Sequence, residues 1–185
     1  MRITDLLDKR SISLDAAPAD KKATLDMAAG LMDVEQYRAQ VYAREEESTT
    51  GIGEGIAIPH GKCDAVKTPG LAAMVIKNGV DYDSLDGEPV TLLFLIAAPN
   101  TKDNVHLDVL SKLSVMLMDE NFTTSLRNAK SVEEFLQIID AADESAKSID
   151  DRLSDTGITT EEKKSFKLLA VTSCPTGIAH TYMAA

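Results

Sequence analysis

Basic residues are too few in this chain for binding to a phosphate backbone. Lysine and arginine together number 19, against 30 aspartate and glutamate residues, which gives a formal net charge of −11. Proteins that hold nucleic acid through its phosphates need clustered positive charge. The composition therefore argues against a nucleic-acid partner.

The sequence also lacks a hydrophobic stretch long enough to cross a membrane. Its longest purely apolar run extends from Leu92 to Ala98, whereas a transmembrane helix needs about 20 apolar residues. The segment Met1-Arg2-Ile3-Thr4-Asp5 has no apolar core of the kind that secretory signals carry. We therefore expect this part of the protein to be cytoplasmic.

Cysteine and aromatic residues are scarce. The chain has two cysteines, no tryptophan and an aromatic content of 4%. Cys63 and Cys174 are far apart in sequence, which argues against a disulfide framework. The remaining composition is ordinary for a globular protein, and 185 residues allow one full domain with a remainder.

Helical and strand patterns alternate between residues 20 and 142. Helices are predicted at 20–31, 33–42, 103–117, 122–127 and 131–142, and largely buried strands at 56–58, 71–76 and 90–97. Asp20 and Ser131 are the predicted N-caps of the first and last helices. Residues 44–55 are predicted to form a polar, glycine-rich loop, with turns at 78–79 and 86–87. This order indicates a layered α/β domain that ends near Ala142.

His60 has the most unusual setting of the three histidines. A glycine-rich segment, a short apolar run and Pro59 precede it, and Gly61 follows it. We expect a ring fixed at the end of a strand, which Gly61 leaves open to a partner. Neutral imidazole can attack phosphorus to form a reactive phosphoramidate, so His60 is a candidate nucleophile. The alternative is a histidine that only bonds a backbone carbonyl.

Two other residues are candidates to assist His60. His106 lies early in a predicted helix, where the helix dipole favours a neutral ring that can orient His60 or bond a phosphoryl oxygen. Arg44 can supply the fixed positive charge that a phosphoryl group in transit needs. On spacing alone, a surface charge or a partner for Glu47 is an equally good interpretation of Arg44.

The two cysteines have different interpretations. Cys63 follows His60 as His-x-x-Cys, and with Asp64 and His106 it gives a possible metal site. Zinc sites usually show paired ligands at both ends, so a small buried residue is the better interpretation of Cys63. Cys174 ends an apolar run and opens a turn into a predicted helix, where backbone N–H groups and the helix end favour a thiolate that holds phosphate. A structural cysteine is the alternative there.

Two motifs resemble parts of the sugar phosphotransferase system. The run TTGIGEGIAIPHGK at 49–62 is similar to the active-site segment of enzyme IIA domains of the fructose–mannitol type. The run VTSCPTGIAHTYMAA at 171–185 is similar to the start of a fructose-type enzyme IIB domain. The resemblance assigns 1–142 to IIA and 166–185 to the beginning of IIB. Residues 143–165, of which 11 of 23 are charged, are then a flexible linker.

The resemblance implies a relay of phosphoryl groups that needs no metal or cofactor. His60 would accept the group from the phosphohistidine of the carrier HPr and pass it to a IIB cysteine, here Cys174, while His106 and Arg44 match the second histidine and the arginine of the family's active site. The IIB domain would then phosphorylate a fructose-like sugar held by a IIC domain, which would keep the intact protein at the inner face of the membrane. The implied fold is an α/β sandwich with a mixed central sheet flanked by helices.

Some questions stay open at this level. The segment 166–185 matches only the beginning of a IIB domain, so we expect it to be disordered and Cys174 to be inactive in this chain. A regulatory IIA-like sensor, whose phosphorylation state controls its partners, is the second hypothesis. A metal-dependent hydrolase using His60, Cys63 and His106 is the third. The sugar, the phosphorylated ring nitrogen and the oligomeric state are not determined by the sequence.

Overall fold

The computed structural model describes residues 2–32, 35–100 and 105–155, with the side chains of residues 35, 105–108 and 146–155 left out of the description. The chain divides into two compact units, Met1–Ser145 and Ala146–Ala185. Among the described residues, the first unit contains every strand and every helix, except that the last helix continues beyond Ser145 to Asp155. Within the described residues, no helix is both long and apolar enough to cross a membrane.

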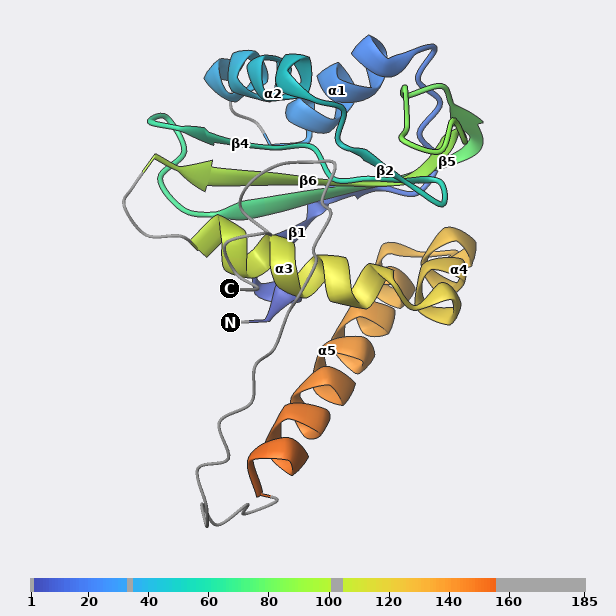
Figure 1. The fold of residues 1–185 in the computed structure, drawn as a ribbon. Coiled ribbons are helices and arrows are strands. Elements are labelled where there is room, and N and C mark those ends of the chain that lie inside the picture. The colour runs from blue at the N-terminus through green and yellow to red at the C-terminus, as the bar shows by residue number, and fades with distance from the viewer. Residues whose placement is uncertain (1, 33–34, 101–104, 156–185) are drawn as a thin grey trace, which may run out of the picture. The chain divides into compact units, whose positions relative to one another are not determined.

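The first unit is built on a six-stranded mixed sheet (Figure 1). Its strands are β1 (Leu7–Ser13), β2 (Gly51–Gly53), β3 (Ile56–Ala57), β4 (His60–Cys63), β5 (Gly70–Val80) and β6 (Val90–Pro99). The order is β1-β5-β6-β3-β2, and β4 also pairs with β6. The β5–β6 and β2–β3 pairs are antiparallel, and the other pairs are parallel. The predicted α/β sandwich with a mixed sheet is confirmed.

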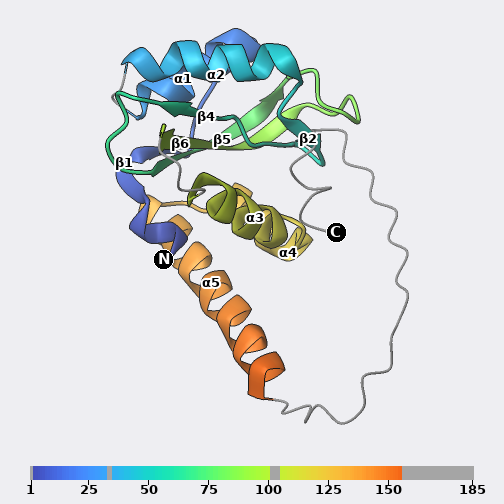
Figure 2. The same ribbon diagram turned by 60° about the vertical axis from the view of Figure 1, so that its left-hand side comes forward.

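Helices cover both faces of this sheet. They are η1 (Ile3–Asp5, a 3-10 turn), α1 (Lys21–Gly30), α2 (Glu35–Glu47), α3 (Val105–Leu117), α4 (Glu120–Asn128) and α5 (Val132–Asp155). Figures 1 and 2 show α1 and α2 on one face of the sheet and α3 on the other. The expected cap of α1 is present, because the Asp20 carboxylate accepts a hydrogen bond of 2.7 Å from the backbone N–H of Ala23.

Alternation along β5 and β6 supplies both halves of the core. Leu93 and Leu95 of β6 pack with α1 and α2, whereas Leu92, Phe94 and Ile96 pack with α3, α4 and α5. Both strands are buried on both faces, which explains why their sequences are nearly continuous apolar runs. The two predicted central strands are therefore confirmed, and both are longer than predicted.

The strand expected at 56–58 is interrupted. Ile56 lies opposite Leu92 and His60 opposite Ile96, so β3 and β4 follow one another along the same edge of β6 with a break at Pro59. Proline has no N–H to donate to the ladder. His60 therefore begins β4, and the prediction that it ends a strand is wrong.

Three other local predictions differ from the structure. Residues 44–47 are the last turn of α2, and the glycine-rich segment forms the β2–β3 hairpin instead of an irregular loop. Positive φ angles at Gly53 (107°), Glu54 (55°) and Gly55 (70°) close this hairpin. Asn78 and Gly79 lie within β5, at an irregularity in its pairing with β6, and do not form a turn between strands. β1 was not predicted.

The end of the first unit also differs from the prediction. The helix expected to end near Ala142 continues to Asp155, so residues 143–155, expected as the start of a flexible linker, are helical. Glycine and proline, which end helices, are absent until Gly157. Asp143 is 1% exposed and belongs to the core, where it pairs with Lys112 and accepts a hydrogen bond of 3.2 Å from the N–H of Ile3. Residues 156–165 lie outside the described residues.

Candidate functional site

His60 and Arg44, 16 positions apart in sequence, line the same pocket. The pocket has a volume of about 460 Å³ and lies between α2 and β4. Its lining residues are Gln40, Ala43, Arg44, Glu47, His60, Gly61, Lys62 and Asn100. The structure thus brings together two of the four predicted site residues.

The ring of His60 is held by a backbone carbonyl from the break between β3 and β4. Nδ1 lies 2.9 Å from the carbonyl oxygen of Ile58. A carbonyl oxygen can only accept a hydrogen bond, so Nδ1 carries the proton in this contact. In the neutral ring the lone pair is then on Nε2. The bond to a backbone carbonyl, considered above as an alternative to a catalytic role, is present, and it fixes which nitrogen of the neutral ring keeps the lone pair.

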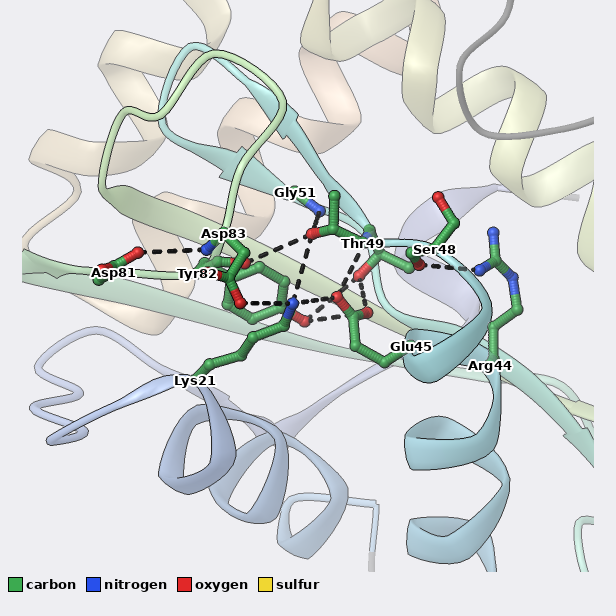
Figure 3. A network of polar contacts seen from close by, with 10 residues as sticks. Lys21, Arg44, Glu45, Ser48, Thr49, Gly51, Asp81, Tyr82 and Asp83 are labelled. Carbon is green, nitrogen blue, oxygen red and sulfur yellow. Dashed lines mark hydrogen bonds and ion pairs between the residues drawn. The ribbon is translucent and has the colours of Figure 1, made fainter.

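Arg44 lies in the last turn of α2 and is partly buried. Its Nη1 donates a hydrogen bond of 3.1 Å to the carbonyl oxygen of Ser48, a contact visible in Figure 3. No ion pair forms between Arg44 and any carboxylate of the described residues, Glu47 included. Within the described part of the chain, no carboxylate is therefore paired with this guanidinium.

Two polar residues of the pocket were not singled out from the sequence. Lys62 lies two residues after His60 in β4 and adds a second cation to the pocket. Asn100 follows the end of β6, which runs parallel to β4. Asn100 follows Pro99, which lies opposite Cys63 in the register, so it lines the pocket from the end of β6 beyond His60.

The position of α2 over β4 depends on Tyr37. Its side chain is fully buried, and its hydroxyl donates a short hydrogen bond to the carbonyl oxygen of Ile96. Burial raises the pKa of the Tyr37 phenol far above its usual value, so the hydroxyl remains a donor. A Cβ added to Gly61 would lie 3.5 Å from the backbone of Gln40 in α2. Gly61 thus faces α2 and lines the pocket beside His60, and the expectation that it leaves His60 open to a partner stays a prediction.

The hairpin that precedes His60 is fixed from two sides. Glu54 has a φ of 55°, which is unusual for a residue other than glycine. Its N–H donates a hydrogen bond of 2.7 Å to Oδ2 of Asp86, and its carbonyl accepts a hydrogen bond of 2.6 Å from Nη2 of Arg127. Nε of Arg127 also donates a hydrogen bond of 2.9 Å to the hydroxyl of Thr91. These side chains offset the backbone strain at Glu54.

The remaining predicted site residues are not placed by the structure. His106 lies in the first turn of α3, as expected, but its side chain is outside the described residues. Cys174 and the whole segment 166–185 are also outside them. Cys63 is buried at the end of β4. Within the part of the chain that the structure describes, no three potential metal ligands lie together.

Comparison with known proteins identifies the family. Residues 5–142 match the family described as "Phosphoenolpyruvate-dependent sugar phosphotransferase system, EIIA 2". The chain belongs to this EIIA 2 family. EIIA domains are phosphotransferase components with a phosphohistidine intermediate, and this chain is one of them.

Relatives and solved structures extend the match. The chain is 43% identical over 192 residues to the fructose-specific EIIABC component of Bacillus subtilis, covering all of this chain and 30% of that protein. The IIA-Ntr nitrogen regulatory protein of Neisseria meningitidis shares 33% identity at a TM-score of 0.70, over 74% of this chain and 98% of the other. The Escherichia coli enzyme IIA of mannitol, solved with phosphorylated IIB, shares 26% identity at a TM-score of 0.64, over 74% of this chain and 99% of the other.

Proposed function

We propose that this EIIA domain accepts a phosphoryl group on Nε2 of His60 from phospho-HPr, or an HPr-like domain, and passes it to a IIB cysteine. The main support for this proposal is the contact between Nδ1 of His60 and the carbonyl of Ile58, which leaves the lone pair of the neutral ring on Nε2. That lone pair forms the new N–P bond while the N–P bond of the donor breaks, and the donor histidine keeps the electron pair. Atoms and charge balance without a metal or cofactor.

Positive charge in the pocket supports this step. Arg44 and Lys62 line the pocket with His60 in a chain whose net charge is −11. Phosphoryl transfer is catalysed mainly by positioning and by stabilising negative charge on the equatorial oxygens. Arg44 binds these oxygens, and His106 orients the group from the first turn of α3.

The rest of the chain supports a relay that continues to a IIB domain. We assign the unit Met1–Ser145 to the EIIA domain, 166–185 to the beginning of a fructose-type IIB domain, and Cys174 to its phosphocysteine. The similarity to a fructose-specific EIIABC component covers the whole chain, and the chain spans 30% of that relative's length. The sugar is then fructose-like, and a IIC domain keeps the cytoplasmic EIIA domain at the inner face of the membrane.

Intact-protein mass spectrometry tests the first step. The chain is incubated with phosphoenolpyruvate, enzyme I and HPr, in parallel with His60→Ala and two matched controls, His180→Ala and Cys174→Ser. We expect one added phosphoryl group in all variants except His60→Ala. An equal mass gain in His60→Ala would overturn the assignment of His60. For His106→Ala we expect slower transfer to a IIB domain with some acceptance retained, and unchanged kinetics would remove His106 from the site.

A regulatory role is the second candidate, because the IIA-Ntr nitrogen regulatory protein is among the similar structures. The two roles differ in the fate of the phosphoryl group. Mixing the phosphorylated chain with a fructose-type IIB domain should move the group to the IIB cysteine if the chain works in transport. Retention of the group on His60 in that mixture would favour the regulatory role.

A further inference from the structure

A buried carboxylate next to Arg44 lies at the centre of a polar network. The side chain of Glu45 is 5% exposed, and an unpaired carboxylate at such a site is strongly destabilising. Its Oε1 is 3.0 Å from Nζ of Lys21 and accepts a bond of 2.9 Å from the N–H of Thr50. Its Oε2 accepts bonds from the hydroxyls of Thr50 (2.5 Å) and Tyr82 (3.4 Å). Figure 3 shows Lys21 and Tyr82 converging on Glu45.

Lys21 links this carboxylate to the protein surface. Its side chain is 24% exposed, and its Nζ lies 4.9 Å from the ring centroid of Tyr82, a cation–π distance. Nζ is also 3.4 Å from Oδ2 of Asp83, whose side chain is 81% exposed. Because exposed ion pairs contribute little, the pair with Glu45 is the one that holds Lys21 in place.

Hydrogen bonds connect Glu45 to the ring of His60. The N–H of Thr50 donates to Glu45, and the carbonyl of Thr50 accepts a bond of 3.0 Å from the N–H of Ile58. The carbonyl of Ile58 in turn accepts the bond of 2.9 Å from Nδ1 of His60. Each link in this series orients the next peptide group. The orientation of the acceptor that fixes the ring therefore depends on Glu45.

The same segment holds Arg44. Its Nη1 donates to the carbonyl of Ser48, two residues before Thr50. Figure 3 shows the side chains of Arg44 and Glu45 leaving the end of α2 in different directions, and the Arg44 side chain reaching Ser48. Glu45 thus anchors a stretch of backbone that contacts Arg44 through Ser48 and His60 through Thr50 and Ile58.

On the basis of the proposed function, we propose that Lys21, Glu45 and Thr50 are positioning residues of the phosphoryl-transfer site. They hold the Ile58 carbonyl where it keeps the proton of the His60 ring on Nδ1, and so keep the lone pair on Nε2. An ionised carboxylate is required because Glu45 accepts hydrogen bonds on both oxygens while it faces an ammonium group. Without it the Thr50 peptide is no longer fixed, and the ring exchanges between its two tautomers.

Nitrogen NMR of the unphosphorylated full-length chain tests this directly, because the two ring nitrogens have different shifts when one of them carries the proton. In Glu45→Gln the amide NH₂ group cannot accept a hydrogen bond, so we expect a population of His60 with the proton on Nε2. Phosphoryl acceptance from phospho-HPr should slow about 10- to 100-fold, as expected for a misplaced reacting group. In Thr50→Val the hydrogen bonds of the hydroxyl with Glu45 and Tyr82 are lost, and we expect a slowing of about 3- to 10-fold.

Two matched variants separate positioning from general stability. Thr50→Ser keeps the hydroxyl, so its ring shifts and its rate should equal those of the chain without substitutions. Asp83→Asn removes only the exposed partner of Lys21 and should change neither. The proposal would be overturned if folded Glu45→Gln and Thr50→Val had the same ring shifts and the same rate as the chain without substitutions. If Glu45→Gln does not fold, Thr50→Val alone decides. Failure of the unmodified chain to accept phosphate would overturn the proposed function, whereas the ring shifts depend only on the positioning.

Discussion

The hydroxyl of Tyr37 donates a hydrogen bond to the carbonyl oxygen of Ile96, the residue that lies opposite His60 in the register of β4 and β6. This bond joins the first turn of α2 to the central strand of the sheet. It is buried, so the carbonyl has no access to water as a substitute partner. The contact therefore sets the height of α2 above β4, and with it the walls of the pocket around His60.

Tyr37→Phe should lower the free energy of unfolding by about 1–3 kcal/mol, because a buried hydrogen bond to the carbonyl of Ile96 is lost. Urea denaturation measures the change. Tyr42→Phe is the matched control: its hydroxyl donates to the carbonyl of Lys22 in an exposed contact, and its loss should cost less than about 0.5 kcal/mol. Equal losses in the two variants would show that the Tyr37 bond has no special structural role.

Arg127→Met should destabilise the domain by roughly 1–3 kcal/mol, because Thr91 and the strained Glu54 both lose a donor. Lys130→Met, at an exposed position just beyond α4, is the control. Thermal unfolding of both variants gives the comparison. If the Glu54 hairpin helps to place His60, Arg127→Met should also slow phosphoryl acceptance, and Lys130→Met should not.

Acidification should weaken the contact of Asp86 with the hairpin. Hydrogen bonds from the N–H groups of Glu88 and Glu54 hold the pKa of Asp86 below its usual value. The folded protein then binds this proton less readily than the unfolded chain, so the stabilisation is present above the ordinary aspartate pKa and is lost as pH falls through the lower, folded value. Denaturation curves at neutral pH and at about pH 3 should show Asp86→Asn as less destabilised in acid than near neutrality. A difference from the unmodified chain that persisted unchanged in acid would contradict this account.

Truncated chains can test where the packed EIIA domain ends. A chain that ends at Asp155 should unfold at the temperature of the full chain. A chain that ends at Ala142 also removes Asp143, which is buried against Lys112 and the N–H of Ile3, and should lose at least about 2 kcal/mol. Calorimetry of the two truncated chains distinguishes these outcomes. Equal unfolding temperatures for both would show that Asp143 does not belong to the packed domain.

Local patterns in the sequence determined much of the fold. Apolar runs identified β5 and β6, because strands buried on both faces need apolar side chains at every position. The cap at Asp20 and the helical periods located α1 and α4 to within a few residues. The run around His60 also indicated the EIIA family, which the comparison confirms, and a phosphohistidine at His60, which stays a prediction.

Features that depend on partners far away in the sequence were not accessible to that reasoning. The glycine-rich segment becomes a hairpin because Asp86 and Arg127 hold Glu54, and nothing near Glu54 in sequence indicates either partner. Charged residues after Ala142 were interpreted as a linker, yet Asp143 is buried because Lys112 compensates its charge. The lone pair on Nε2 likewise follows from one carbonyl group, which only the strand break at Pro59 brings to Nδ1. The sequence by itself determined the family and the candidate site residues, because side-chain type and local spacing are contained in it. The tertiary structure decided how those residues are oriented, because hydrogen bonds between distant segments exist only once the chain has folded.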